Sequence, residues 1–200
     1  MKQGIYRILK NEEAAPGIYR MLLQGDTSAF LRGGQFVDIA VGGCFLRRPI
    51  AVREWNDDSF DIYYKVIGKG TSELCRMDSG CTLDILTGLG NGFDSEECRE
   101  SALVVCGGLG ASPAFSLVKK LAAGGKKVTV ILGFNKASEL VLFDDYRRLG
   151  VDLHLVTLDG SAGLKGLVTD AIRELRPEYD YFYTCGPKVM MKAVCEMLDG

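Results

Sequence analysis

Short apolar runs separated by turn residues fill the first half of the chain. These runs have the length of β-strands and lie at residues 5–9, 18–23, 36–41, 60–67 and 83–86. Strand-sized runs of this kind, bounded by turn residues, are typical of β-structure. A series of short strands with no long helix between them predicts a small antiparallel β-barrel.

The apolar pattern changes near residue 98, where strands begin to alternate with helices. The predicted strands lie at 102–106, 127–132, 151–156 and 179–184, and the predicted helices at 112–123, 137–148, 164–175 and 187–198. This alternation is typical of an open parallel sheet in an α/β domain. We therefore predict two domains, 1–98 and 99–200, joined by the polar segment 91–100.

The first strand of the predicted sheet ends in a glycine-rich turn. The apolar run Leu103–Cys106 leads into Gly107, Gly108 and Gly110, and a helix is predicted from Ser112. Glycine lets a ligand approach the backbone, and the N–H groups at a helix start favour phosphate. This turn indicates a nucleotide site.

A second turn of this kind closes the last predicted strand. The apolar run 181–184 leads into Cys185, Gly186 and Pro187, and proline is well suited to the first position of a helix. One glycine cluster is weak support, because tight turns use glycine for structural reasons too. Two such turns in one domain predict a nucleotide lying across the ends of two parallel strands.

Composition narrows the class of protein. The 200 residues are 47% hydrophobic, which supports a real core, and the net charge of −2 comes without a basic block. We therefore expect no binding to nucleic acid and, with apolar runs only of strand length, no membrane span. Seven scattered cysteines, an odd number without CxxC spacing, favour reduced thiols in the cytoplasm and no metal site in this chain.

The segment 45–52, which reads FLRRPIAV, carries the first candidate site of the barrel. An arginine fixed in a strand beside a proline, here Arg48 before Pro49, is suited to bidentate pairing with a pyrophosphate. Alternate residues of such a strand face a flat aromatic ring. The alternative is that Arg48 is an ordinary surface charge.

The segment 63–71, which reads YYKVIGKGT, carries the second candidate site of the barrel. The strand ends in glycines and a helix is predicted from Thr71, which again indicates a phosphate site. The alternative is an ordinary turn.

Taken in order, RRPIAV, YYKVIGKGT, LGNGF, CGGLGASP and CGPKVMM resemble the electron-transfer subunits of type B dihydroorotate dehydrogenase. The resemblance covers essentially the whole chain, and this family shares the plan of the ferredoxin reductases. It implies a barrel that holds FAD, followed by an α/β domain that binds NAD.

The resemblance also implies roles for single residues in the flavin site. The residues expected to line the flavin, to contact its ring and ribityl region, or to hold its pyrophosphate are Arg48, Pro49, Ile50, Ala51, Tyr63, Tyr64, Lys65, Gly70 and Thr71. One position departs from the family. Where Ala51 stands, the family often has a serine or threonine whose hydroxyl bonds flavin N5, so a backbone N–H would have to serve here.

In the NAD site, the resemblance places a group of turn residues against the dinucleotide. They are Gly107, Gly108 and Gly110 at the pyrophosphate, and Cys185, Gly186 and Pro187 near the nicotinamide. We expect Cys185 to touch the nicotinamide without a covalent role; the alternative is a buried thiol at a strand end. Phe134 is a candidate for stacking on adenine. The lack of an arginine after the second strand predicts NAD rather than NADP, although Lys136 lies there.

Two further departures concern cysteine. Cys106 stands where related reductases usually have glycine, and we interpret it as a small buried filler. The family also carries four cysteines in a C-terminal segment that bind a 2Fe-2S cluster, and these are absent from residues 1–200. We expect the cluster only in a longer form of the chain.

The function implied is that of an oxidoreductase subunit in pyrimidine biosynthesis. It would pass electrons, by way of FAD, between NAD and a partner flavoprotein that oxidises dihydroorotate. The expected partner is an FMN-containing catalytic subunit, in a heterotetramer. Two alternatives stay open: a subunit of an NAD(P)H-dependent ferredoxin or sulfide reductase, and a non-catalytic FAD-binding fragment. The direction of electron flow is not determined by the sequence.

Overall fold

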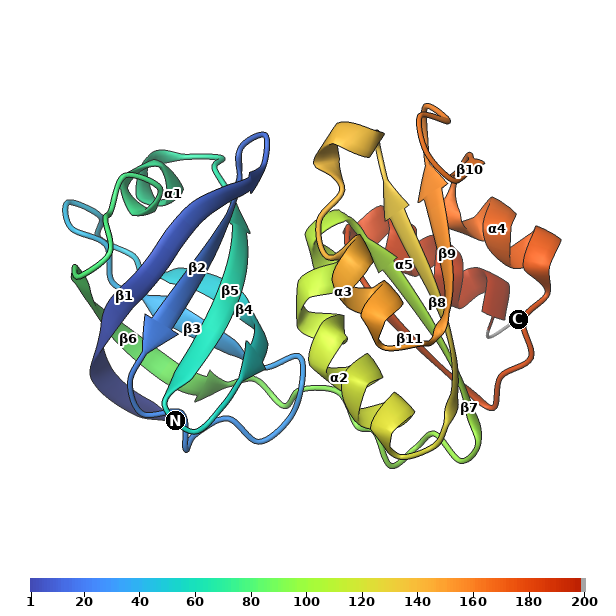
Figure 1. Cartoon of the computed structure of the whole chain (residues 1–200), viewed down its shortest axis with the longest axis horizontal. Helices are drawn as coiled ribbons and strands as arrows, with labels where there is room; N and C mark the ends of the chain where they lie inside the picture. The colour runs from blue at the N-terminus through green and yellow to red at the C-terminus, as the bar shows by residue number, and fades with distance from the viewer. Residues whose placement is uncertain (199–200) are drawn as a thin grey trace. The chain divides into compact units, whose positions relative to one another are not determined.

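A computed structural model describes residues 1–198, and the chain forms two compact units (Figure 1). The first unit is Met1–Phe93, and the second begins at Asp94. The sequence places the boundary a few residues later, after residue 98, in the same polar segment. The predicted architecture, an antiparallel barrel followed by a parallel sheet with helices, is confirmed.

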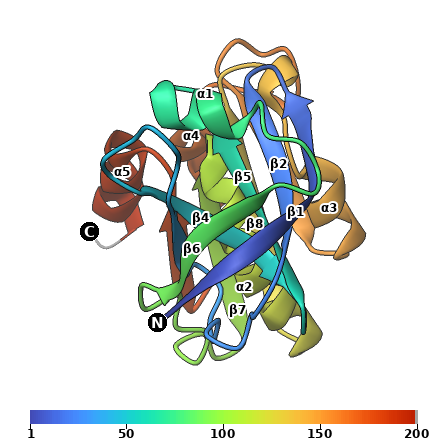
Figure 2. The ribbon, with the colours of Figure 1, turned by 90° about the vertical axis from the view of Figure 1, so that its left-hand side faces the viewer.

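The first unit is a closed barrel of six strands in the order β1-β2-β5-β4-β3-β6 (Figure 2). Its strands are β1 (Lys2–Ala15), β2 (Ile18–Gln24), β3 (Phe36–Ile39), β4 (Arg48–Trp55), β5 (Ser59–Lys65) and β6 (Thr82–Leu89). Successive side chains of a strand point to opposite faces. In β1, for example, Tyr6 and Ile8 point into the barrel and are buried, whereas Ile5 is exposed.

A short helix, α1 (Lys69–Leu74), lies at one end of the barrel (Figures 1 and 2). It begins two residues before the predicted start at Thr71. The side chain of Asn11 on β1 donates hydrogen bonds of 2.9 Å to the carbonyls of Leu74 and Met77. These bonds satisfy carbonyl groups at the end of the helix and attach it to the barrel.

The second unit is built on a five-stranded sheet in the order β10-β9-β8-β7-β11, with neighbouring strands parallel. Its strands are β7 (Ser101–Gly107), β8 (Lys127–Phe134), β9 (Asp152–Thr157), β10 (Leu164–Lys165) and β11 (Tyr181–Cys185). Its helices are η1 (Gly108–Gly110), α2 (Ala111–Ala123), η2 (Ala137–Glu139), α3 (Phe143–Arg148), α4 (Val168–Leu175) and α5 (Lys188–Leu198).

Helices cover both faces of this sheet, α2 and α3 on one and α4 and α5 on the other (Figure 1). On the α4–α5 face, Leu103 and Val105 of β7 pack in one core with Ile172 and Val194. On the other face, α2 and α3 meet where the rings of Phe115 and Tyr146 lie edge to face. Because the helices cover the two faces of the sheet, the carboxyl ends of its strands are followed by loops that the helices do not cover.

Two predicted helices are shorter than the sequence indicates. The predicted helix 137–148 is divided into η2 and α3, because Leu142 takes a left-handed conformation (φ 64°) and its side chain is buried. The predicted helix 164–175 begins only at Val168, after the short strand β10 and Gly166 (φ 136°). No helix in residues 1–198 is long and apolar enough to span a bilayer.

Candidate functional site

At the end of the barrel, Arg48 and Gly70 lie against each other. Arg48 is the first residue of β4, and Gly70 follows the first residue of α1. A β-carbon built on Gly70 would lie 2.9 Å from the guanidinium carbon of Arg48, so only glycine leaves room for this group. Nη1 of Arg48 donates to the carbonyls of Leu46 (2.7 Å) and Arg47 (3.1 Å). A fixed cation therefore stands at the start of α1.

The turn before α1 is closed by the hydroxyl of Thr71. Its oxygen accepts hydrogen bonds from the backbone N–H groups of Ile67 (3.0 Å) and Gly68 (3.2 Å). The ammonium group of Lys69 donates to the carbonyl of Gly43 (2.9 Å) and ties in the neighbouring loop. The Thr71 hydroxyl is thus engaged in shaping the turn.

The predicted flavin residues of β4 and β5 fall into two groups, those that point into the barrel and those that point outward. The side chains of Ile50 and Tyr64 point into the barrel and belong to its core. Tyr64 is 3% exposed and donates a hydrogen bond of 2.9 Å to Asn11. That these two residues line a flavin stays a prediction, and alternation along the strands turns their side chains inward. Pro49 and Ala51 point the other way, to the outer face.

Tyr63 and Lys65 share that outer face of the barrel. Val52 of β4 lies opposite Ile62 of β5, which sets Ala51 and Tyr63 on the same side of the sheet. Lys65 is exposed, whereas Tyr63 is only 8% exposed. The structure therefore brings Pro49, Ala51, Tyr63 and Lys65 to one surface.

In the second unit, the two glycine-containing turns interlock. A β-carbon on Gly110 would clash with the carbonyl group of Cys185, and one on Gly186 would lie 2.9 Å from the backbone nitrogen of Gly107. One on Gly107 would meet Pro187 Cδ at the same distance. Gly110 and Gly186 therefore serve the packing of one turn on the other. That Gly110 also lies at a pyrophosphate stays a prediction, because the position of a β-carbon shows only that its α-carbon packs against the Cys185 carbonyl.

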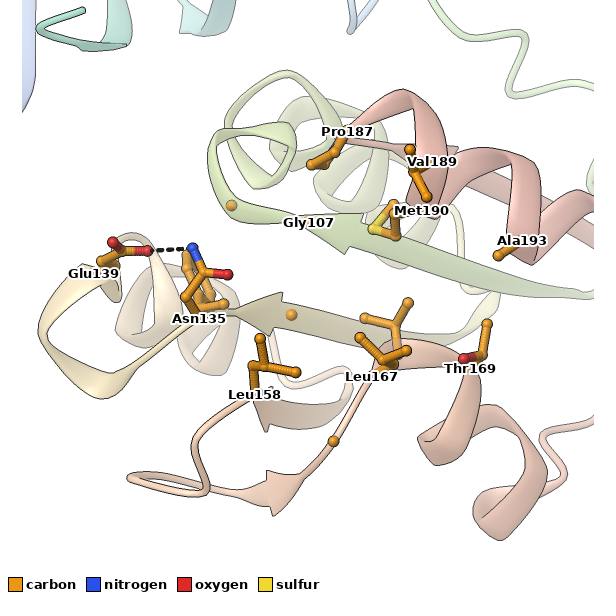
Figure 3. A pocket seen from close by; sticks show the side chains of 15 residues that line it. Gly107, Asn135, Glu139, Leu158, Leu167, Thr169, Pro187, Val189, Met190 and Ala193 are labelled. Carbon is orange, nitrogen blue, oxygen red and sulfur yellow. Dashed lines mark hydrogen bonds between the residues drawn. The ribbon is translucent and has the colours of Figure 1, made fainter.

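A cavity of about 350 Å³ opens at the carboxyl ends of β7 and β8 (Figure 3). Its walls are mainly apolar, and the residues that form them are Gly107, Gly108, Gly133, Phe134, Asn135, Glu139, Leu158, Gly166, Leu167, Val168, Thr169, Pro187, Val189, Met190 and Ala193. Four of the predicted NAD residues are among them: Gly107, Gly108, Phe134 and Pro187. Volume, position and apolar walls are those of a nucleotide site in an open α/β sheet.

Cys185 lies at the end of β11, opposite Cys106 on β7, and is not among the residues that line the cavity. Cys106 is fully buried, which is consistent with a small filler in the sheet. Burial raises the pKa of Cys185, and it raises the pKa of Cys106 well above the ordinary thiol value. Both thiols are therefore protonated at neutral pH, and Cys185 is not an activated nucleophile.

Several cavity residues were missed by sequence reasoning because they come from loops far apart in the chain. Leu158 follows β9 and is 52% exposed, and Leu167 precedes α4 and is 56% exposed. Figure 3 shows both on the side of the cavity away from Pro187, Leu158 next to Asn135 and Leu167 next to Thr169. One signal was present: Gly166 stands before a helix, as in the two turns that were recognised.

The loops after β8 and β9 are joined by hydrogen bonds. The N–H of Ala137 donates to Oγ of Ser161 (2.7 Å), and the N–H of Asp159 donates to the carbonyl of Asn135 (3.2 Å). Hydrogen bonds from Ser161 and the positive charge of Lys136 hold the pKa of Asp159 below its usual range. These contacts fix the shape of the cavity rim. Within residues 1–198, no group of three acidic, histidine or cysteine side chains is arranged to hold a metal ion.

Comparison with known proteins relates these sites to redox enzymes. Residues 104–196 match the family described as "Oxidoreductase NAD-binding domain". A protein of Lysinibacillus sphaericus (strain C3-41) named "Dihydroorotate dehydrogenase B (NAD(+)), electron transfer subunit" is 35% identical, over 97% of this chain and 78% of its own length. A protein of the same name from Fusobacterium nucleatum is 36% identical, over 92% of this chain and 76% of its own length.

Solved structures agree on the fold. An NADH-dependent reduced ferredoxin-NADP oxidoreductase, described for flavin-based electron bifurcation, is 30% identical with a TM-score of 0.86, over 96% of this chain and 71% of that one. A ferredoxin NADP+ reductase from Neisseria gonorrhoeae has a TM-score of 0.84 at 20% identity, over 100% of this chain and 92% of that one. At this lower identity the likeness shows the fold alone.

Proposed function

The chain belongs to the family of electron-transfer subunits of dihydroorotate dehydrogenase B, and from this premise we propose that it carries electrons between NAD and a flavoprotein partner that oxidises dihydroorotate. The observation that carries the proposal is the relationship itself, 35% identity over 97% of the chain, which includes both units. The pathway is pyrimidine biosynthesis. The odd number of scattered cysteines supports the cytoplasm as its compartment.

The end of the barrel fits the diphosphate of FAD. The guanidinium of Arg48 supplies a cation of the right chemistry, and Gly70 keeps the space beside it free of a side chain. The outer face with Pro49 and Ala51 is assigned to the flavin ring. Because Ala51 lacks a hydroxyl, a backbone N–H would have to meet flavin N5. FAD held there would supply both hydride acceptance and one-electron transfer, the chemistry that links a nicotinamide to one-electron carriers.

The cavity of the second unit fits NAD. Gly107 and Gly108 stand at the start of the η1–α2 segment, where backbone N–H groups favour a diphosphate. Phe134 and Leu158 offer apolar surface to adenine. Pro187 and the neighbouring Cys185 are assigned to the nicotinamide end, where the protonated thiol packs and excludes water.

The oxidation of dihydroorotate is assigned to the catalytic partner subunit. We propose that this partner contains FMN and that two copies of each subunit form a heterotetramer. A 2Fe-2S cluster is expected only in longer forms of the chain, and none of the steps assigned here to its residues depends on it.

The test is an anaerobic reconstitution. The purified chain should show a flavin spectrum that NADH bleaches, and it should reduce artificial acceptors with NADH. With the partner subunit and dihydroorotate it should reduce NAD+ only slowly, because residues 1–200 lack the four cluster cysteines. The matched control is the Arg48→Ala variant purified without flavin, which should not support the reaction. A longer form that carries the cluster cysteines and still never couples dihydroorotate to NAD+ would overturn the proposal, as would a chain whose flavin NADH does not bleach.

A second candidate is supported by the 30% identity to the ferredoxin-linked oxidoreductase. In that case the electron partner would be reduced ferredoxin. The same reconstitution distinguishes the two, because reduced ferredoxin, instead of dihydroorotate and its oxidising subunit, would then drive NAD+ reduction.

A further inference from the structure

One carboxylate lies in the wall of the NAD cavity. Among the lining residues that the structure describes, Glu139 alone carries a formal charge. The side-chain amide of Asn135 donates to Oε2 of Glu139 at 3.0 Å, as Figure 3 shows. The amide therefore orients the carboxylate.

The backbone that carries Glu139 is also fixed. Oγ of Ser161 accepts a hydrogen bond from the N–H of Ala137, and the carbonyl of Asn135 accepts one from the N–H of Asp159. These two bonds attach the loop after β8 to the loop after β9. The N–H of Glu139 donates to the carbonyl of Lys136 (3.0 Å) within the short helix η2. A group held in this way loses little freedom when it binds a ligand.

Strand order assigns this carboxylate to one end of a dinucleotide. In the sequence β9-β8-β7-β11, Glu139 follows β8, whereas the Cys185-Gly186-Pro187 turn follows β11 on the other side of β7. A diphosphate at Gly107 and Gly108, at the end of β7, has one nucleoside on each side. With the nicotinamide at β11, the adenosine ribose lies at β8.

We propose that Glu139, positioned by Asn135, accepts a hydrogen bond from the 2′-hydroxyl of the adenosine ribose and so selects NAD against NADP. This inference rests on the proposed function, because it requires that NAD binds in this cavity. A 2′-phosphate would bring negative charge close to a carboxylate whose position is fixed by Asn135. Lys136 adds one positive charge to the same loop and contributes to lowering the pKa of Asp159. The local charge of Glu139, Asp159 and Lys136 together is negative.

The experiment measures binding of NAD+, NADP+ and 2′-deoxyadenosine NAD+ to the oxidised FAD-loaded protein by calorimetry, without turnover. Wild type should bind NAD+ about tenfold more tightly than the 2′-deoxy form, in the range of a hydrogen bond to a charged group. Glu139→Gln should lose about tenfold in affinity for NAD+ and lose almost nothing for the 2′-deoxy form. Its affinity for NADP+ should rise.

The matched control is Glu174→Gln, the same change at an exposed position of α4 outside the cavity, which should leave all three affinities unchanged. Asn135→Ala should show a smaller version of the Glu139→Gln pattern, because it frees the carboxylate without removing it. Equal loss of NAD+ and 2′-deoxy NAD+ in Glu139→Gln would overturn the ribose assignment and leave the proposed function standing. Failure of wild type to bind NAD+ at all would overturn both.

Discussion

Gly70 faces the guanidinium group of Arg48 so closely that a β-carbon on it would lie 2.9 Å from the guanidinium carbon. The two residues lie 22 positions apart in the sequence, yet the guanidinium can take this position only because residue 70 has no side chain. Arg48 supplies the charge, and Gly70 supplies the space that lets the charge stand at the start of α1. The site therefore depends on both residues, and substitution of either one tests it.

Arg48→Ala should lose flavin. A charge-assisted bidentate contact with a diphosphate contributes about 1.5 to 3 kcal/mol, which is about ten- to hundredfold in FAD affinity. The measurement is the FAD-to-protein ratio after purification and the affinity on reconstitution. Arg76→Ala, at an exposed arginine beyond α1, is the control and should retain flavin. A full complement of FAD in Arg48→Ala would show that the pyrophosphate lies elsewhere.

Gly70→Ala should weaken FAD binding through Arg48. The new β-carbon would meet the flexible end of the arginine side chain, so the guanidinium has to move while the fold is kept. The check is a double-mutant cycle: Gly70→Ala should cost affinity in wild type and almost nothing in the Arg48→Ala background. Equal costs in both backgrounds would mean that Gly70 acts independently of the arginine.

Gly110→Ala should destabilise the second unit. Its β-carbon would lie 2.5 Å from the carbonyl carbon of Cys185 and 2.8 Å from the nitrogen of Gly186. These are backbone atoms, which cannot move aside as the end of a flexible side chain can. Overpacking of this kind costs about 1 to 3 kcal/mol in the free energy of unfolding. Urea unfolding measures it. Gly124→Ala, whose β-carbon would meet nothing closer than 3.4 Å, should be neutral or stabilising; similar losses in both variants would contradict the argument.

Asp180 should make the second unit sensitive to acid. Its carboxylate accepts the N–H groups of Ser101 (2.8 Å), Glu100 (2.6 Å) and Arg99 (2.9 Å), and these bonds lower its pKa to about 2. An unfolded aspartate has a pKa of about 3.9. The ionised group therefore stabilises the fold above about pH 4, and this contribution is lost as the pH falls toward 2. Asp180→Asn should remove that part of the pH dependence in thermal unfolding, whereas Glu178→Gln should preserve it.

Cys185 should react slowly and should not be essential. Because burial raises its pKa, alkylation by iodoacetamide at pH 7 should be slow and should increase only in the alkaline range, while the exposed Cys81 reacts first. Cys185→Ala should retain most NADH-dependent reduction of an artificial acceptor. A loss of about 10² to 10⁴-fold, the range for removal of an acid or base, would instead indicate a chemical role.

The fold was predictable from the sequence where the local hydrophobic pattern and the packing of the folded chain favour the same secondary structure. The run Leu103–Cys106 is apolar throughout and is buried on both faces, so its strand character is clear from the sequence. Residues 140–142 are also apolar, but there the pattern was misread as part of a helix. The left-handed conformation of Leu142 lets two neighbouring side chains enter the core, and this preference arises from packing rather than from the local sequence.

The site was predictable only in part, for two physical reasons. A glycine that admits a ligand and a glycine that admits backbone look alike in sequence, so Gly107 and Gly110 were given the same role and only the first lines the cavity. Tyr64 could have been assigned to the core by counting alternate residues. Leu158 and Glu139 could not have been found in this way, because only the folded sheet brings their loops together.

Closure of the barrel sets the order in which the first unit forms during synthesis. Its seam joins β1 to β6, where Tyr6 lies opposite Leu83 and Lys2 opposite Thr87. Closing so long a loop is slow, because the entropy of the intervening chain is lost before these contacts form. On the ribosome, β1 must wait with one side unpaired until β6 has emerged. The segments assigned to the flavin, β4, β5 and α1, are therefore all made before the strand that closes the barrel around them.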